Sequence, residues 1–211
     1  MVRDNRHLVY QFRITLNGTQ PPIWRRIQVP ASYSFWDLHV ALQDSMGWLD
    51  YHLHVFLMRK PHKRKAAEIG IPDGEFADHV VLPCWRIPIA EYFTAPGSTA
   101  VYRYDFGDDW EHEVLLEGIL LKEKDTKYPT CLAGERACPP EDCGGVHGYL
   151  NLLDILSNPQ HEEHEEMVGW LKGHPGNYHP YRPDEFEPQL VRFDDPEKRW
   201  RLAFCGDDDG L

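Results

Sequence analysis

Four side chains that commonly ligate metals fall within seventeen residues of the chain. They follow the spacing C-x6-C-x4-C-x3-H and are Cys131, Cys138, Cys143 and His147. The segment 128–145 is rich in Cys and Pro and shows no periodic apolar pattern, so we expect an irregular loop. Thiols and one imidazole in such a loop are typical of a small structural zinc site. There is no CxxC pair, and the alternative is a loop whose free thiols are simply buried.

A second group of candidates is acidic and lies in the sequence VYRYDFGDDWEHEV, residues 101–114. Two alternating apolar runs flank a short turn, which predicts a β-hairpin. The tip carries the candidates for a catalytic site, which are Asp105, Asp108, Asp109, Glu111 and His112. Oxygen ligands suit Mg²⁺, Ca²⁺ or Mn²⁺. The alternative is a well-solvated hairpin end whose charge repulsion is softened by Arg103.

The register of this hairpin follows from its apolar face. We expect Phe106 to pair with Trp110 around a three-residue turn, because a two-residue turn would set the apolar face against Glu side chains. Asp105 then lies directly across from Glu111. Opposed like charges destabilise a sheet unless something neutralises them, and a divalent cation would do so.

Shorter motifs also suggest chemistry, but the kinase and zincin interpretations are excluded. His52 and His54 fall on one face of a predicted strand, a spacing that can bind metal, whereas a lone His among aromatic residues is more often part of the core. The DFG string at 105–107 lacks the Gly-rich loop, strand Lys and HRD motif of a kinase. The HEEH string at 161–164 lacks the spacing of a zincin helix. No Walker or G-x-S-x-G motif is present.

The elements that must position these residues can be read from periodicity. Strands are expected at 8–16, where the even-numbered residues should be buried, near 23–29 and at 52–58. Ser34 and Asp37 form a capping box that begins a helix, which Gly47 ends. Residues 61–79 are expected to form a loop, and 88–93 one or two helical turns. Helices are expected over 146–159 and 161–173, with a short one near 196–203.

Charge and composition restrict the partners. The net charge of the 211 residues is −12, although Arg59 to Lys65 form a local basic patch. We therefore expect no tight binding to duplex DNA at physiological salt, and a protein is the expected partner. No apolar run is long enough for a membrane span, and no signal peptide is recognised. A cytoplasmic location is therefore expected, and an odd number of cysteines, five, suits free thiols or metal ligands better than a disulfide framework.

The strings YRYDFGDDWEH and YPTCLAGERACPPEDCGGVHGY together resemble the plasmid pRiA4b ORF-3-like family. Some members of that family are labelled TnpR-like passengers of insertion sequences. The opening YQFRITLNGTQPPIWRRIQVP, the string SFWDLHVALQDSMGW and the string HLHVF also match, so the resemblance covers about residues 8–190. It implies an α+β fold that opens β-β-α-β, somewhat like a β-grasp, and implies no established activity. No recombinase-like Ser or Tyr with an Arg cluster is found.

These observations together predict an α+β protein with a mostly antiparallel or mixed sheet and helices in its C-terminal third. Residues 1–190 are expected to form a single domain, followed by an acidic segment, 191–211. The expected function is that of a mobile-element-associated, non-catalytic accessory module that acts through protein contacts. The alternative is a metal-dependent hydrolase or nuclease that uses the carboxylates and His of residues 105–112. A structural zinc ion is the cofactor under consideration, and the sequence leaves open whether the protein is an enzyme.

Overall fold

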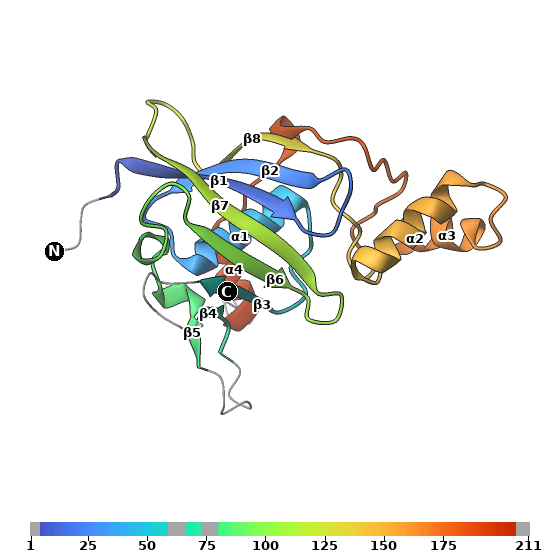
Figure 1. Cartoon of the computed structure of the whole chain (residues 1–211), viewed down its shortest axis with the longest axis horizontal. Coiled ribbons are helices and arrows are strands. Elements are labelled where there is room, and N and C mark those ends of the chain that lie inside the picture. The colour runs from blue at the N-terminus through green and yellow to red at the C-terminus, as the bar shows by residue number, and fades with distance from the viewer. Residues whose placement is uncertain (1–4, 59–65, 73–79, 206–211) are drawn as a thin grey trace, which may run out of the picture.

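The computed structural model describes residues 5–58, 66–72 and 80–205. Eight strands form one sheet in the order β5-β4-β3-β6-β7-β1-β2-β8 (Figure 1). Only β4 and β5 pair in parallel, and every other neighbouring pair is antiparallel. The strands are β1 Leu8–Leu16, β2 Ile23–Pro30, β3 His54–Met58, β4 Ala67–Gly70, β5 Val81–Pro83, β6 Thr99–Tyr104, β7 Trp110–Leu121 and β8 Thr130–Glu135. The predicted α+β class is therefore confirmed.

Four α-helices and three short 3₁₀ turns complete the described chain. Helix α1 packs on one face of the sheet, while α2 and α3 stand apart from it beside the tip of the β6–β7 hairpin (Figure 1). No described helix is long and apolar enough to cross a membrane. The helices are α1 Phe35–Met46, α2 Gly145–Ser157, α3 His164–Gly173 and α4 Pro196–Phe204, and the 3₁₀ turns are Cys84–Arg86, Ile89–Glu91 and Pro188–Leu190.

Local sequence rules account for the first third of the chain. The side chains of Tyr10, Phe12, Ile14 and Leu16 are buried in the same core as α1, as the alternation in 8–16 predicts, whereas Leu8 is half-buried and the odd-numbered Val9 is fully buried. Ser34 accepts a hydrogen bond from the Asp37 N–H, while the Asp37 carboxylate accepts one from the Ser34 N–H. Two orphan amides are thereby satisfied at the start of α1.

The C-terminal helix α4 packs back onto α1. Trp200 and Phe204 lie with their ring centroids 5.2 and 5.6 Å from that of Trp36. Arg199 pairs with Asp44 at 2.7 Å, which ties α4 to the last turn of α1. Residues 191–205 are therefore joined to the sheet domain by aromatic and ionic contacts.

Two expectations about the elements are wrong. The segment 61–79 was expected to be a loop but contains strand β4, and Cys131 lies in strand β8 although 128–145 was expected to be irregular. Both strands are short and are held by pairing with distant strands, so local pattern gives little sign of them. The basic patch Arg59 to Lys65 lies outside the described residues.

The predicted register of the β6–β7 hairpin is wrong by two residues. Tyr104, not Phe106, pairs with Trp110, and Glu111 lies opposite Arg103 rather than Asp105. The turn is two residues longer than expected, because Asp105 takes a positive φ of 54° and its carbonyl accepts the Asp109 N–H. Phe106 is consequently 53% exposed.

Candidate metal centre

Three donor side chains from distant parts of the chain converge beside the β6–β7 turn. His52 precedes β3, Asp105 follows β6, and Asp142 precedes α2. Their ligand atoms all lie within 4.8 Å of one another, and no other such group occurs in residues 5–58, 66–72 and 80–205. The His52 Nε2 atom is 3.0 Å from an Asp142 oxygen and 3.6 Å from an Asp105 oxygen. His174 Nε2 approaches the other Asp142 oxygen at 3.8 Å.

The turn geometry fixes Asp105. Its backbone N–H donates to the Leu53 carbonyl at 3.0 Å, which joins the turn to the segment that carries His52. One carboxylate oxygen of Asp105 accepts the Gly107 N–H at 2.9 Å, and the other faces His52. Asp and Asn tolerate positive φ because such local side-chain bonds compensate it. The positive φ of Asp105, which also makes the turn longer than expected, therefore directs this carboxylate toward His52.

The same turn docks on the start of α2. The Gly144 N–H donates to an Asp108 carboxylate oxygen at 3.1 Å. A Cβ atom at Gly145 would overlap the Asp108 carbonyl oxygen, so only glycine permits this approach. The contact brings Asp142, two residues before Gly144, alongside Asp105.

Glu141 anchors the loop that carries Asp142. It is 1% exposed and accepts hydrogen bonds from the Tyr104 hydroxyl at 2.5 Å and the Leu49 N–H at 2.6 Å. Trp48 donates from its indole to the Pro139 carbonyl at 2.9 Å. Burial raises the pKa of Glu141. Because Glu141 points inward and is fully bonded, the next side chain, Asp142, is left facing His52.

The donor set is one imidazole and two carboxylates. The His52 Nε2 atom is buried and has no hydrogen-bond partner, while the side chains of His52 and Asp142 are 30% and 51% exposed. Mixed nitrogen and oxygen donors suit Zn²⁺, Mn²⁺ or Fe²⁺ better than Ca²⁺, which prefers oxygen alone. The arrangement can hold such an ion and leaves it open to solvent on the Asp142 side.

Of the five acidic-hairpin candidates, Asp105 alone belongs to this group. Asp108 accepts the N–H of Gly144, just before α2, Asp109 accepts the Arg103 Nε–H at 2.9 Å, and Glu111 accepts the Asn17 amide at 2.9 Å. His112 is fully buried, and burial lowers its pKa to about 3. The predicted pairing of Asp105 with Glu111 is wrong, so repulsion between those two carboxylates gives no reason for a cation.

The four predicted zinc ligands lie on different elements of the fold. Cys131 is in β8, Cys138 is buried beside the Arg25 guanidinium, and His147 is exposed on α2. Burial raises the pKa of Cys143 to about 12, so its thiol is protonated. These four side chains do not form a ligand group among the described residues. The zinc site therefore remains a prediction.

The histidine pair separates in the same way. His54 is buried in β3 and stacks on His39 with ring centroids 3.5 Å apart, whereas His52 lies outside the strand at the metal centre. Sequence reasoning considered His52 only as half of that pair, and it did not single out Asp142. One signal was available, because His52, Asp105 and Asp142 all lie in or beside the strings that carried the family resemblance.

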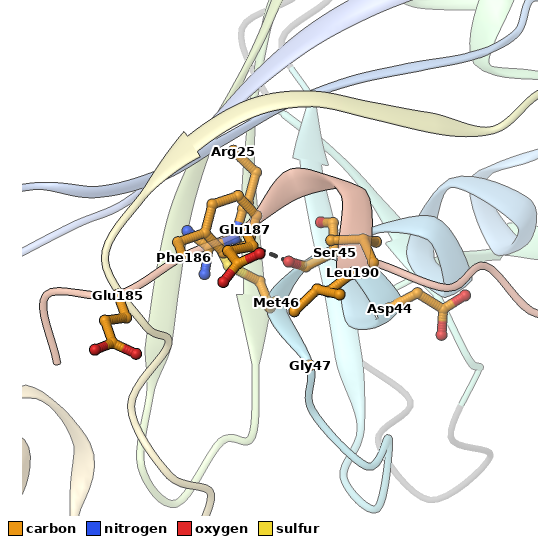
Figure 2. Close-up of a pocket in the computed structure, with 10 residues that line it drawn as sticks. Arg25, Asp44, Ser45, Met46, Gly47, Glu185, Phe186, Glu187 and Leu190 are labelled. Carbon is orange, nitrogen blue, oxygen red and sulfur yellow. Dashed lines mark hydrogen bonds between the residues drawn. The ribbon is translucent and has the colours of Figure 1, made fainter. Parts of the chain in front are cut away.

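A separate cavity of about 320 Å³ lies at the C-terminal end of α1 (Figure 2). Arg25 lies at its inner wall and donates to the carbonyls of Ser45, Trp24 and Glu135 at 2.8–3.0 Å. The Phe186 ring covers the guanidinium, with its centroid 3.6 Å from Cζ. Arg25 thus ties α1, β2 and β8 together, and no metal-ligand group of described residues lines the cavity.

Comparisons with known proteins identify relatives of the whole chain. The family model for plasmid pRiA4b ORF-3-like proteins matches residues 8–190. The uncharacterized protein y4hQ of Sinorhizobium fredii is 34% identical over 163 residues, covering 77% of this chain and 80% of that protein. The crystal structure of the protein of unknown function MM3350 from Methanosarcina mazei Go1 superposes with a TM-score of 0.77. It shares 40% identity and covers 88% of this chain and 98% of that one.

Proposed function

Since the chain belongs to the plasmid pRiA4b ORF-3-like family, for which these relatives' names state no activity, we propose a function from the site itself. The protein is a metal-dependent hydrolase whose ion is bound by His52, Asp105 and Asp142. The observation that carries this proposal is the convergence of the three donors within 4.8 Å, in which the buried His52 Nε2 atom makes no hydrogen bond but lies 3.0 Å from an Asp142 oxygen.

The number of ligands favours a catalytic rather than a structural ion. Structural zinc sites are usually closed by four protein ligands, whereas catalytic sites use three and keep a position for water. Here the three donors leave such a position, and the 51% exposure of Asp142 gives water access to it. A divalent ion held by His52, Asp105 and Asp142 would lower the pKa of its bound water toward neutrality, and so would supply a nucleophile for ester or amide hydrolysis.

Charge decides between a hydrolase and a nuclease. Two of the three donors are acidic, no Lys or Arg makes a described ion pair with any of the three, and the whole chain carries −12. A nucleic-acid phosphate would therefore approach against repulsion, with no basic side chain to hold it. The proposal is restricted to substrates that are not polyanions, and its chemistry is hydrolysis at a carbonyl.

Metal titration tests the site directly. Protein stripped with a chelator should bind one Zn²⁺ or Mn²⁺ per chain in calorimetry and gain thermal stability by mass action. Asp142→Asn should weaken that affinity at least tenfold, while the control Asp109→Asn, a surface carboxylate on the same turn, should leave it unchanged. Hydrolysis of p-nitrophenyl acetate should follow metal occupancy. Equal metal affinity in the wild-type protein and Asp142→Asn would overturn the assignment.

An accessory role through protein contacts is the second candidate. The large exposed apolar side chains, which include Tyr51, Leu121, Leu190 and Leu202, belong to separate segments of the chain. Single exposed apolar residues are ordinary on protein surfaces, so this role has weaker support than the metal site. A cytoplasmic place of action belongs to either proposal and is supported by the five cysteines, all of which are free.

A further inference from the structure

A second cavity, of about 240 Å³, lies between α2 and α3. Asp142 belongs both to its wall and to the three-donor group, so the cavity opens beside the candidate metal centre. His174 strengthens this connection, because its ring lies 5.4 Å from that of Trp170 and its Nε2 atom 3.8 Å from Asp142. The lining residues are Asp142, Cys143, Gly148, Asn151, Leu152, Ile155, Met167 and Trp170.

We propose that this α2–α3 cavity is the substrate pocket of the proposed hydrolase and takes a ring-sized apolar group of an uncharged or cationic ester or amide. The inference rests on the proposed metal site, because without an ion beside it the cavity would bind the ring group but would not place a substrate for hydrolysis.

The size of the cavity fixes the size of the group. An engineered protein cavity of about 150 Å³ binds benzene, whereas pockets for drug-sized ligands are about 300–1,000 Å³. A volume of about 240 Å³ therefore accepts one six-membered ring with a short linker, and excludes a whole peptide or nucleotide. The remainder of the substrate must lie outside, toward Asp142 and solvent.

The lining fixes the chemistry of the group. The apolar walls of the cavity are formed by Leu152, Ile155, Met167 and Trp170. Gly148 also lines the cavity, and it carries no side chain because a Cβ there would overlap the Cys143 carbonyl oxygen. Asp142 is the one charged residue in the lining, and Glu165 and Glu166 lie in the first turn of α3. An anionic group would be repelled, while a neutral or cationic one is accepted.

The four methionines provide a selective readout of this pocket. Met167 lines it, Met46 lines the separate cavity at the end of α1, and Met58 is buried in β3. In chelator-stripped protein carrying ¹³C-methyl methionine, benzyl alcohol and benzylamine should shift the Met167 methyl signal saturably and leave Met46 in place. Benzoate, of the same size, should bind at least tenfold more weakly. Asn151→Phe should abolish the shift by filling the cavity, while the control Leu150→Phe, exposed on the same helix, should retain it.

A metal-binding ring compound separates this inference from the metal site. Benzohydroxamate should bind the Zn²⁺-loaded protein at least tenfold more tightly than the stripped protein, and Asp142→Asn should lose that gain. If calorimetry shows Zn²⁺ binding but no ring compound shifts Met167, the pocket inference is wrong and the metal site stands. If ring compounds shift Met167 but Zn²⁺ does not bind, the proposed function fails and the catalytic reading of the pocket fails with it.

Discussion

Replacing His112 by Phe should flatten the pH dependence of stability. His112 is fully buried in β7, between Trp48 and Tyr102 at ring-centroid distances of 5.3 and 5.5 Å. Neither ring nitrogen has a hydrogen-bond partner. Burial lowers the pKa of His112 from its ordinary 6.5 to about 3, so the folded state excludes a proton that the unfolded chain binds.

The magnitude follows from linkage. Stability from neutral His112 is complete above pH 6.5 and is lost as the pH falls toward 3. At about 1.36 kcal/mol per pKa unit, the difference between the pKa values of 6.5 and about 3 corresponds to about 5 kcal/mol of stability in total. Near pH 5, the free energy of unfolding falls by about 1.4 kcal/mol for each unit by which the pH decreases. Burial and the neighbouring His39 also lower the pKa of His54, which adds a second contribution of the same sign.

Urea unfolding at several pH values between 7 and 4, with chelator present, measures this slope. His112→Phe should be about as stable as the wild type at pH 7, because a Phe ring keeps the aromatic contacts with Trp48 and Tyr102. Its slope should be lower by about 1.4 kcal/mol per pH unit. The control His147→Gln, exposed on α2, should keep the wild-type slope. Identical slopes for His112→Phe and the wild type would refute the reasoning.

Three further predictions test the packing and the capping box. Phe12→Ala should lower the free energy of unfolding by about 3–5 kcal/mol through the cavity it leaves, whereas the half-exposed Phe106→Ala should change it by less than about 0.5 kcal/mol in the same urea titration. Gly148→Ala should lower the thermal midpoint, because its Cβ would overlap the Cys143 carbonyl oxygen in the loop that carries Asp142. Gly169→Ala, with open space around it, should instead raise stability by up to about 1 kcal/mol. A variant order reversed in thermal unfolding would contradict the packing. Ser34→Ala should cost about 1 kcal/mol by calorimetry, and an unchanged midpoint would show that the capping box contributes nothing.

Elements specified by local rules could be predicted from the sequence. The alternation in 8–16 fixed the buried face of β1, and Ser34, Asp37 and Gly47 marked both ends of α1. These signals depend on neighbouring residues alone. Strands β4 and β8 escaped prediction because their hydrogen bonds come from β3, β5 and β2, so their stability is set by residues far away in the sequence.

The candidate site could be predicted only in part. Asp105 was identified, but for a wrong reason, since the local bond from Gly107 N–H to its carboxylate reshaped the turn. His52 and Asp142 gave no local signal, because their proximity depends on the docking of Gly144 and Gly145 against Asp108. A contact between three segments about 40–50 residues apart is a property of the tertiary fold, which single-sequence periodicity does not report.

The central position of β1 has a consequence for synthesis on the ribosome. Leu16 pairs with His112, and Trp24 of β2 pairs with Glu135, so both outer edges of the β1–β2 hairpin await strands made about a hundred residues later. At ~5–20 residues per second, that interval is about 5–20 s. An isolated two-stranded hairpin is marginally stable, and its unpaired edges can join those of another nascent chain. The yield of folded protein in a cell should therefore rise with chaperone supply and fall when many ribosomes translate one message closely together.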